Sequence, residues 1–234
     1  MDDPVPAARA VVAELFPAVR WAVLGGSVLT AARTAGSDLD IVVCLDGEAD
    51  VPYRLSLRRA WPVELFVHDA DSLDRYLAKD VARRQPSLHR MLADGTVVAG
   101  DAGEATRVRD RCAAALAAGP DPLGDAEWLR LRYAVTDLLD DLAHSRDGGE
   151  TVVVAATLWT SAATLALHAG GHWVGSGKWL LRELRAYDPA LADRWLAAHG
   201  DPVAVGAFAT EALDRVGGPL FDGYRAGGER PGTA

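Results

Sequence analysis

Two aspartates stand one residue apart at the start of an apolar segment, 38-DLDIVVCL-45. Side chains on a β-strand alternate between two faces, so Asp38 and Asp40 should share one face while Leu39 and Ile41 point into the core. Two carboxylates about 4 Å apart repel by about 4 kcal/mol at an effective dielectric constant of about 20. A bound cation removes that cost, and Mg²⁺ commonly takes one or two carboxylates together with substrate phosphates.

A third acid stands alone in another apolar segment, 62-PVELFVH-68. If this segment forms a strand beside 38–45, Glu64 can project from the same face as Asp38 and Asp40. Three acids from two adjacent strands can hold two metal ions about 4 Å apart, an arrangement that clamps the attacking and leaving oxygens of phosphoryl transfer. The sequence therefore predicts that these three acids are catalytic and bind metal, with two Mg²⁺ ions as cofactors.

A glycine turn precedes the acids, in 23-VLGGSVL-29. Gly25 and Gly26 allow the backbone to approach a ligand closely, and Ser27 adds a hydroxyl at the start of an expected helix, where backbone N–H groups bind phosphate. We therefore predict that all three contact a nucleotide. Taken singly, each signal has an ordinary explanation: a turn, a capped strand start and an edge-strand charge. Their joint order and spacing favour a site.

The pattern G-S-x10-D-x-D, followed by one acid in a later strand, is carried by Gly26, Ser27, Asp38, Asp40 and Glu64. Over residues 19–68 it resembles the DNA polymerase beta-type nucleotidyltransferase superfamily. The resemblance implies a small mixed sheet flanked by helices, and transfer of a nucleoside monophosphate from a nucleoside triphosphate, expected to be ATP, with release of pyrophosphate. The second half of the chain is similar in architecture to the bundle of kanamycin-, streptomycin- and lincosamide-type antibiotic nucleotidyltransferases, which implies a small-molecule acceptor such as an antibiotic.

The elements that must position these residues predict an α+β protein. Strands are expected at 19–24, 38–45, 62–68 and 95–100, while 51–60 is ambiguous. Helices are expected at 5–16, 27–34 and 70–84, the last capped by Asp69. From residue 102 onward strand signals vanish, and helices are expected at 102–118, 125–145, 150–169, 176–187, 189–198 and 202–217. We predict a catalytic domain over 1–100, a helical bundle over 101–222 and a flexible tail over 223–234.

Lys178 follows a Gly-Ser-Gly turn at an expected helix start, where a lysine is unfavourable for the helix dipole unless an anion is bound. We predict that it contacts the triphosphate, with an ordinary surface lysine as the alternative. Trp173 and Trp179 could stack on a ring of either substrate or simply be core residues. Arg33 could touch phosphates or be an exposed arginine.

The general base is left open between Glu64 and an acid of the helical half. The candidates in that half are Glu127, Asp137, Asp140 and Asp141. Asp137 and Asp141 share a helix face by their spacing of four residues. A solvated acidic helix face is the ordinary explanation for these acids.

The 234 residues carry a formal net charge of −9, which argues against a nucleic-acid partner. Two distant cysteines and an N-terminus without a basic region favour a cytoplasmic protein. No membrane association is expected, because the longest apolar run, 152–170, contains Thr, Ser and His. We expect a monomer or a homodimer that binds a nucleoside triphosphate and a small-molecule acceptor. The alternatives are a protein AMP-transferring enzyme, similar to antitoxin-type nucleotidyltransferases, and a non-catalytic nucleotide-binding regulatory module.

Overall fold

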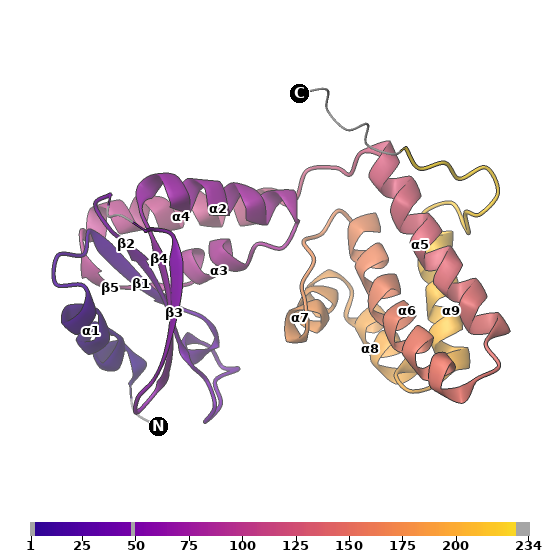
Figure 1. The fold of residues 1–234 in the computed structure, drawn as a ribbon, viewed down its shortest axis with the longest axis horizontal. Helices are drawn as coiled ribbons and strands as arrows, with labels where there is room; N and C mark the ends of the chain where they lie inside the picture. Colours follow the sequence, from indigo (N-terminus) through magenta and orange to yellow (C-terminus); the bar gives the residue numbers. More distant parts are fainter. Residues whose placement is uncertain (1–2, 48–49, 228–234) are drawn as a thin grey trace. The chain divides into compact units, whose positions relative to one another are not determined.

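The structure, a computed structural model, describes residues 3–47 and 50–227 (Figure 1). The chain divides into two compact units, Met1–Gly119 and Pro120–Ala234, which are described separately. The first contains strands and helices and the second contains helices, so the predicted α+β class is confirmed. Of the predicted flexible tail, residues 228–234 lie outside the described residues.

Within the described residues, the first unit contains a five-stranded mixed sheet in the order β3-β4-β2-β1-β5. Its strands are β1 (Trp21–Gly25), β2 (Leu39–Cys44), β3 (Tyr53–Arg58), β4 (Pro62–His68) and β5 (Thr96–Gly100). Strands β2 and β4 are parallel, and the other neighbouring pairs are antiparallel. The four predicted strands are confirmed, and the ambiguous segment forms the edge strand β3, whose exposed polar residues alternate with half-buried leucines.

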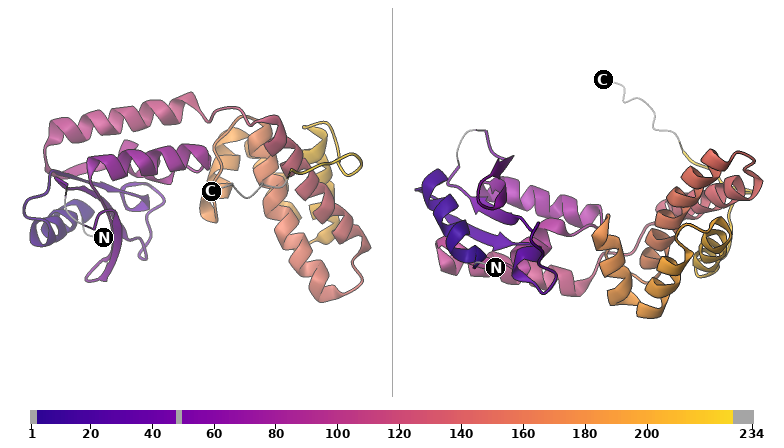
Figure 2. Two further views of the ribbon diagram at one scale, coloured as in Figure 1. Left: turned by 45° about the horizontal axis from the view of Figure 1, so that its top comes forward. Right: turned by 90° about the horizontal axis from the view of Figure 1, so that it is seen from below.

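Helices cover both faces of this sheet (Figures 1 and 2). Helix α1 (Pro4–Leu15) packs on the face that carries Leu39, Ile41 and the other inward residues of β2. Helices α2 (Ala70–Ala82), α3 (Ser87–Ala93) and α4 (Ala102–Ala118) pack on the opposite face. Leu39 and Ile41 are fully buried, as the alternation predicts for the face opposite to that of Asp40.

The apolar layer under α2, α3 and α4 ends one row short of the acids. Val23, Val42 and Phe66 belong to this layer and occupy paired positions on three adjacent strands. The next paired row on the same face is Gly25, Asp40 and Glu64. The sheet therefore presents two carboxylates directly beyond the edge of its core.

The boundary between the two units lies at Gly119, not at residue 100 as the sequence analysis predicts. Ala105 and Cys112 of α4 are buried in the same apolar cluster as Trp21 and Val23 of β1. In addition, Glu104 accepts a hydrogen bond from Arg20 at 2.8 Å. The loss of strand signals after residue 100 reflects a helix that covers the sheet, rather than the start of another domain.

Two helices of the first unit are fixed by aspartates. Asp69 caps α2, as predicted, and accepts the backbone N–H of Ser72 at 2.6 Å; this hydrogen bond lowers the pKa of the Asp69 carboxyl. Helix α3, which the sequence analysis does not predict, has no cap of its own. Its N–H at Leu88 instead donates to the buried carboxylate of Asp80 at 2.7 Å, from eight residues earlier.

The second unit is a bundle of α5 (Asp125–His144), α6 (Gly148–Ala169), α7 (Lys178–Tyr187), α8 (Pro189–Ala198) and α9 (Pro202–Asp214). These helices match the predicted ones closely. Helix α6 is long and apolar enough to cross a membrane by length and composition, but its buried positions form the centre of the bundle core. Trp159 of α6 stacks on Trp195 of α8 at 3.9 Å, and each indole N–H donates to the other residue's carbonyl.

Gly25 is required where α3 crosses the end of β1. A Cβ added at this position would lie 2.5 Å from the carbonyl oxygen and 2.8 Å from the Cα of Met91. Both are backbone atoms of a packed helix and cannot move aside without shifting that helix. Gly25 therefore has a packing role, which differs from the ligand approach that the sequence analysis gives as the reason for a glycine here.

We expect Gly25→Ala to lower the free energy of unfolding by about 1–3 kcal/mol, because overpacking displaces α3 from the sheet. Urea unfolding followed by circular dichroism measures the change. The control is Gly36→Ala, where the nearest atom to an added Cβ is 3.9 Å away. Equal stability of the two variants would contradict this account of Gly25.

Candidate metal centre

Asp38, Asp40 and Glu64 converge at the edge of the sheet. Asp40 and Glu64 are direct partners in the parallel register of β2 and β4, and Asp38 precedes β2 by one residue. One carboxylate oxygen from each of the three lies within 4.8 Å of the others, and all three residues are half-buried. The predicted convergence of the three acids is thus present in the fold.

The donor set suits a hard divalent cation. Three carboxylates without a histidine or cysteine offer oxygen ligands, which Mg²⁺ and Mn²⁺ prefer. Held this close, the carboxylates repel one another, and partial burial strengthens the repulsion because less water screens it. These three residues could therefore hold a cation, with further positions left for water or substrate oxygens.

The glycine turn lies against this cluster. Gly26 has φ +81°, a conformation that favours glycine, and a Cβ added there would lie 2.1 Å from Oδ2 of Asp40. Gly25 is the cross-strand partner of Asp40. The turn and the carboxylates are therefore neighbours in space, as the sequence pattern predicts, and Gly26 leaves room for the Asp40 carboxylate.

The helix predicted at 27–34 is a single 3₁₀ turn, Ser27–Leu29. The chain leaves it at Thr30, whose hydroxyl and N–H both donate to the Ser27 carbonyl. So short a turn has almost no macrodipole, so the phosphate-binding helix start expected at Ser27 is absent. Any anion contact from this segment would come from single N–H groups and the Ser27 hydroxyl, which lies 3.5 Å from that of Ser37.

The loop that leads to Asp38 is held at two points. Ser37 is buried, and its hydroxyl accepts the N–H of Thr34 at 3.0 Å. The Arg33 guanidinium lies 4.9 Å from the ring centroid of Trp61, in the turn between β3 and β4. The sequence analysis considered Arg33 as a phosphate contact. In the structure it packs on Trp61, and this contact helps to hold the loop that positions Asp38.

Arg54 is a residue of this site that the sequence analysis does not identify. Its Nη2 donates to Oε2 of Glu64 across the β3–β4 pair, and its guanidinium lies 5.0 Å from the ring centroid of Phe66. The sequence does contain a signal for this strand, because the polar residues Arg54, Ser56 and Arg58 alternate with apolar ones. It became informative only once the register of β3 against β4 was known.

The remaining candidates belong to the second unit. Lys178 is the first residue of α7 and is exposed, and its contact with a triphosphate stays a prediction. Trp173 is buried, whereas Trp179 is half-buried under the guanidinium of Arg182.

The proposed helical bases likewise lie in the second unit. Glu127 is exposed, and Asp137 lies 3.5 Å from the hydroxyl of Tyr133. Asp140 and Asp141 line an open hollow between α5 and α6. Their roles stay predictions.

Comparisons with known proteins give little further information. No family model matches the chain, and no curated protein matches it. Among solved structures, the chain is similar to a nucleotidyltransferase-like protein from Exiguobacterium sibiricum 255-15, with 14% identity and a TM-score of 0.43. The alignment covers 92% of this chain and 74% of that one.

We expect Gly26→Ala to weaken binding of Mn²⁺ or Mg²⁺ by about tenfold or more, because the new methyl group displaces the Asp40 carboxylate. Isothermal titration calorimetry measures the affinity. Gly47→Ala is the matched control: Gly47 also has positive φ, +59°, but an added Cβ meets nothing within 4 Å. Equal metal affinity in both variants would remove Gly26 from the site.

Proposed function

We propose that this protein is a metal-dependent nucleotidyltransferase, which moves a nucleoside monophosphate from a nucleoside triphosphate, in the first instance ATP, to a hydroxyl of a small-molecule acceptor. One observation carries the proposal. Three carboxylates, two of them at paired positions of β2 and β4, approach within 4.8 Å of one another beside a glycine turn. Carboxylates beside a glycine turn support the proposal, because they would provide cation ligands close to the position that we expect for a phosphate chain.

In this mechanism Asp38, Asp40 and Glu64 hold divalent cations, expected to be Mg²⁺, which supply charge neutralisation at the α-phosphoryl group when bound. The acceptor oxygen forms a bond to the α-phosphorus, the bond from that phosphorus to the bridging oxygen breaks, and pyrophosphate leaves. The proton of the acceptor hydroxyl passes to a carboxylate. The protein mainly positions these groups in line, and the fixed register of β2 and β4 suits that task.

The acceptor is proposed from charge and from the resemblance in the sequence. A formal net charge of −9 favours a cationic small molecule, and the antibiotic-type resemblance suggests an aminoglycoside or a lincosamide. In the direct experiment, the purified protein is incubated with Mg²⁺, each labelled nucleoside triphosphate and a panel of these acceptors. Pyrophosphate release that requires a small-molecule acceptor supports the proposal, transfer of label to a protein supports protein modification, and nucleotide binding without turnover supports a regulatory module.

We expect Asp40→Asn to lower the turnover by about 100-fold or more, since removing one contact that stabilises charge in a transition state costs roughly 3 kcal/mol. Its far-UV circular dichroism spectrum should match that of the unaltered protein, because Asp40 is half-buried at the end of the sheet rather than part of its core. The control is Asp46→Asn, which removes the same charge just beyond the far end of β2, where Asp46 is exposed and pairs with Arg20 at 3.5 Å. Full turnover in Asp40→Asn would refute the assigned role.

A further inference from the structure

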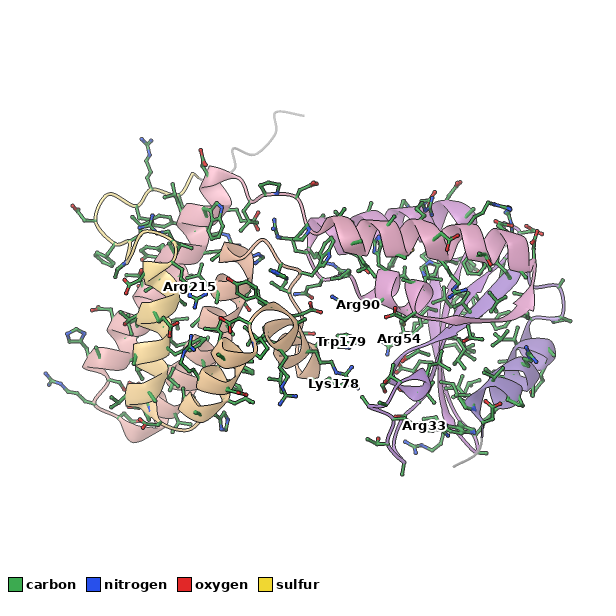
Figure 3. All side chains as sticks on the ribbon, turned by 180° about the vertical axis from the view of Figure 1, so that it is seen from behind. Arg33, Arg54, Arg90, Lys178, Trp179 and Arg215 are labelled. Carbon is green, nitrogen blue, oxygen red and sulfur yellow. The ribbon has the colours of Figure 1, made fainter. Side chains whose placement is uncertain are left out.

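Arg54 places a positive charge on one of the three proposed metal ligands. Figure 3 labels it on the first unit together with Arg33 and Arg90, three arginines that come from β3, the loop before β2 and α3. Arg54 donates through Nη2 to Oε2 of Glu64, a carboxylate of the site. The positively charged guanidinium of Arg54 therefore already contacts a carboxylate that a metal ion would use.

The register of the sheet fixes this pairing. Arg54 is the cross-strand partner of Phe66, and Ser56 is that of Glu64, so Arg54 reaches Glu64 diagonally along one face. The guanidinium also lies over the ring of Phe66, 5.0 Å from its centroid. This cation–π contact does not depend on which anion the guanidinium bonds, so the side chain can exchange partners and keep its place.

The two side chains differ in freedom to move. The Arg54 side chain is 56% exposed, whereas that of Glu64 is 26% exposed and projects from a strand paired on both sides. If one of them must move, it is the arginine. Once released from Glu64, its guanidinium could donate two parallel hydrogen bonds to a phosphate.

A divalent cation and Arg54 compete for Glu64. A cation bound to this carboxylate would stand a few ångströms from the guanidinium and be repelled by it. An anion that bridges the two positive charges removes this conflict, and a triphosphate carries several negative charges that can do so.

We propose that Arg54 makes the binding of a divalent cation by Glu64 conditional on a nucleoside triphosphate. Without nucleotide, the guanidinium neutralises Glu64. With nucleotide, it moves to the phosphates, remains on Phe66 and leaves Glu64 to the cation. This inference rests on the proposed function, because it takes Glu64 as a metal ligand and a triphosphate as the bridging anion.

The test compares two affinities in the unaltered protein and in Arg54→Gln. One is for Mn²⁺ without nucleotide, and the other is for a non-hydrolysable ATP analogue at saturating Mg²⁺, both by calorimetry. The variant should bind Mn²⁺ about 2- to 5-fold more tightly, since an exposed ion pair no longer competes. It should bind the analogue about tenfold more weakly, since a charge-assisted hydrogen bond is lost.

The opposite signs of the two changes separate this role from a structural one. If Arg54 merely supported the fold, both affinities would fall together, and that result would overturn the inference, as would two unchanged affinities. Arg54→Lys keeps the charge but not the planar fork. It should bind Mn²⁺ as the unaltered protein does and bind the analogue with an affinity between the other two.

Arg59→Gln is the matched control. Arg59 is also an arginine paired with a glutamate, Glu14 of α1, which packs on the opposite face of the sheet. Neither affinity should change in this variant, and a change equal to that of Arg54→Gln would reduce the effect to net charge and overturn the inference.

Failure of the proposed function has a different signature. If the unaltered protein binds neither Mn²⁺ nor the analogue, the proposed function fails and the inference about Arg54 falls with it. If the unaltered protein binds both and Arg54→Gln does not shift them in opposite directions, only the inference about Arg54 is overturned.

Discussion

The repulsion among Asp38, Asp40 and Glu64 is the constraint on which the rest of the first unit depends. Side chains on long loops would relieve it by turning apart, but two of these acids occupy paired positions on parallel strands, where the register holds them together. The strands are in turn fixed by an apolar layer on each face. The hydrophobic core therefore holds these carboxylates together at the end of the sheet, an arrangement that would suit a bound cation.

The two adjacent glycines of the turn serve this arrangement in different ways. Gly25 lets the backbone of α3 come close to the end of β1. A Cβ added at Gly26 would instead lie 2.1 Å from Oδ2 of Asp40, so this second glycine leaves space for the carboxylate. Either change to alanine adds one methyl group, but the first would meet a packed helix and the second a charged side chain. Two glycines that resemble a single flexible turn in the sequence thus have different roles: the first allows a helix to pack closely, and the second leaves space for a carboxylate of the site.

The sequence predicted what depends on long periodic patterns and missed what depends on tertiary contacts. The strands that carry Asp40 and Glu64 were predictable because each is an apolar run that contains a single acid. The bundle helices were predictable because each is long enough to show a helical period. Helix α3 was missed because its seven residues span only about two turns and the carboxylate that binds its first turn, Asp80, is distant in sequence. The domain boundary was misplaced because a helix that covers a sheet and a helix of a separate bundle have the same pattern. Arg54 was missed because only the register of β3 against β4 pairs it with Glu64.

The charge of the site also bears on the kind of ligand it can accept. The three carboxylates carry three negative charges, and the Arg54 guanidinium that bonds Glu64 carries one positive charge. Two divalent cations would exceed the charge of the carboxylates unless they arrived with an anion. A small neutral molecule offers no such compensation, whereas a polyphosphate does. The composition of the site is therefore the reason for proposing a ligand that brings negative charge and metal together, such as a nucleoside triphosphate.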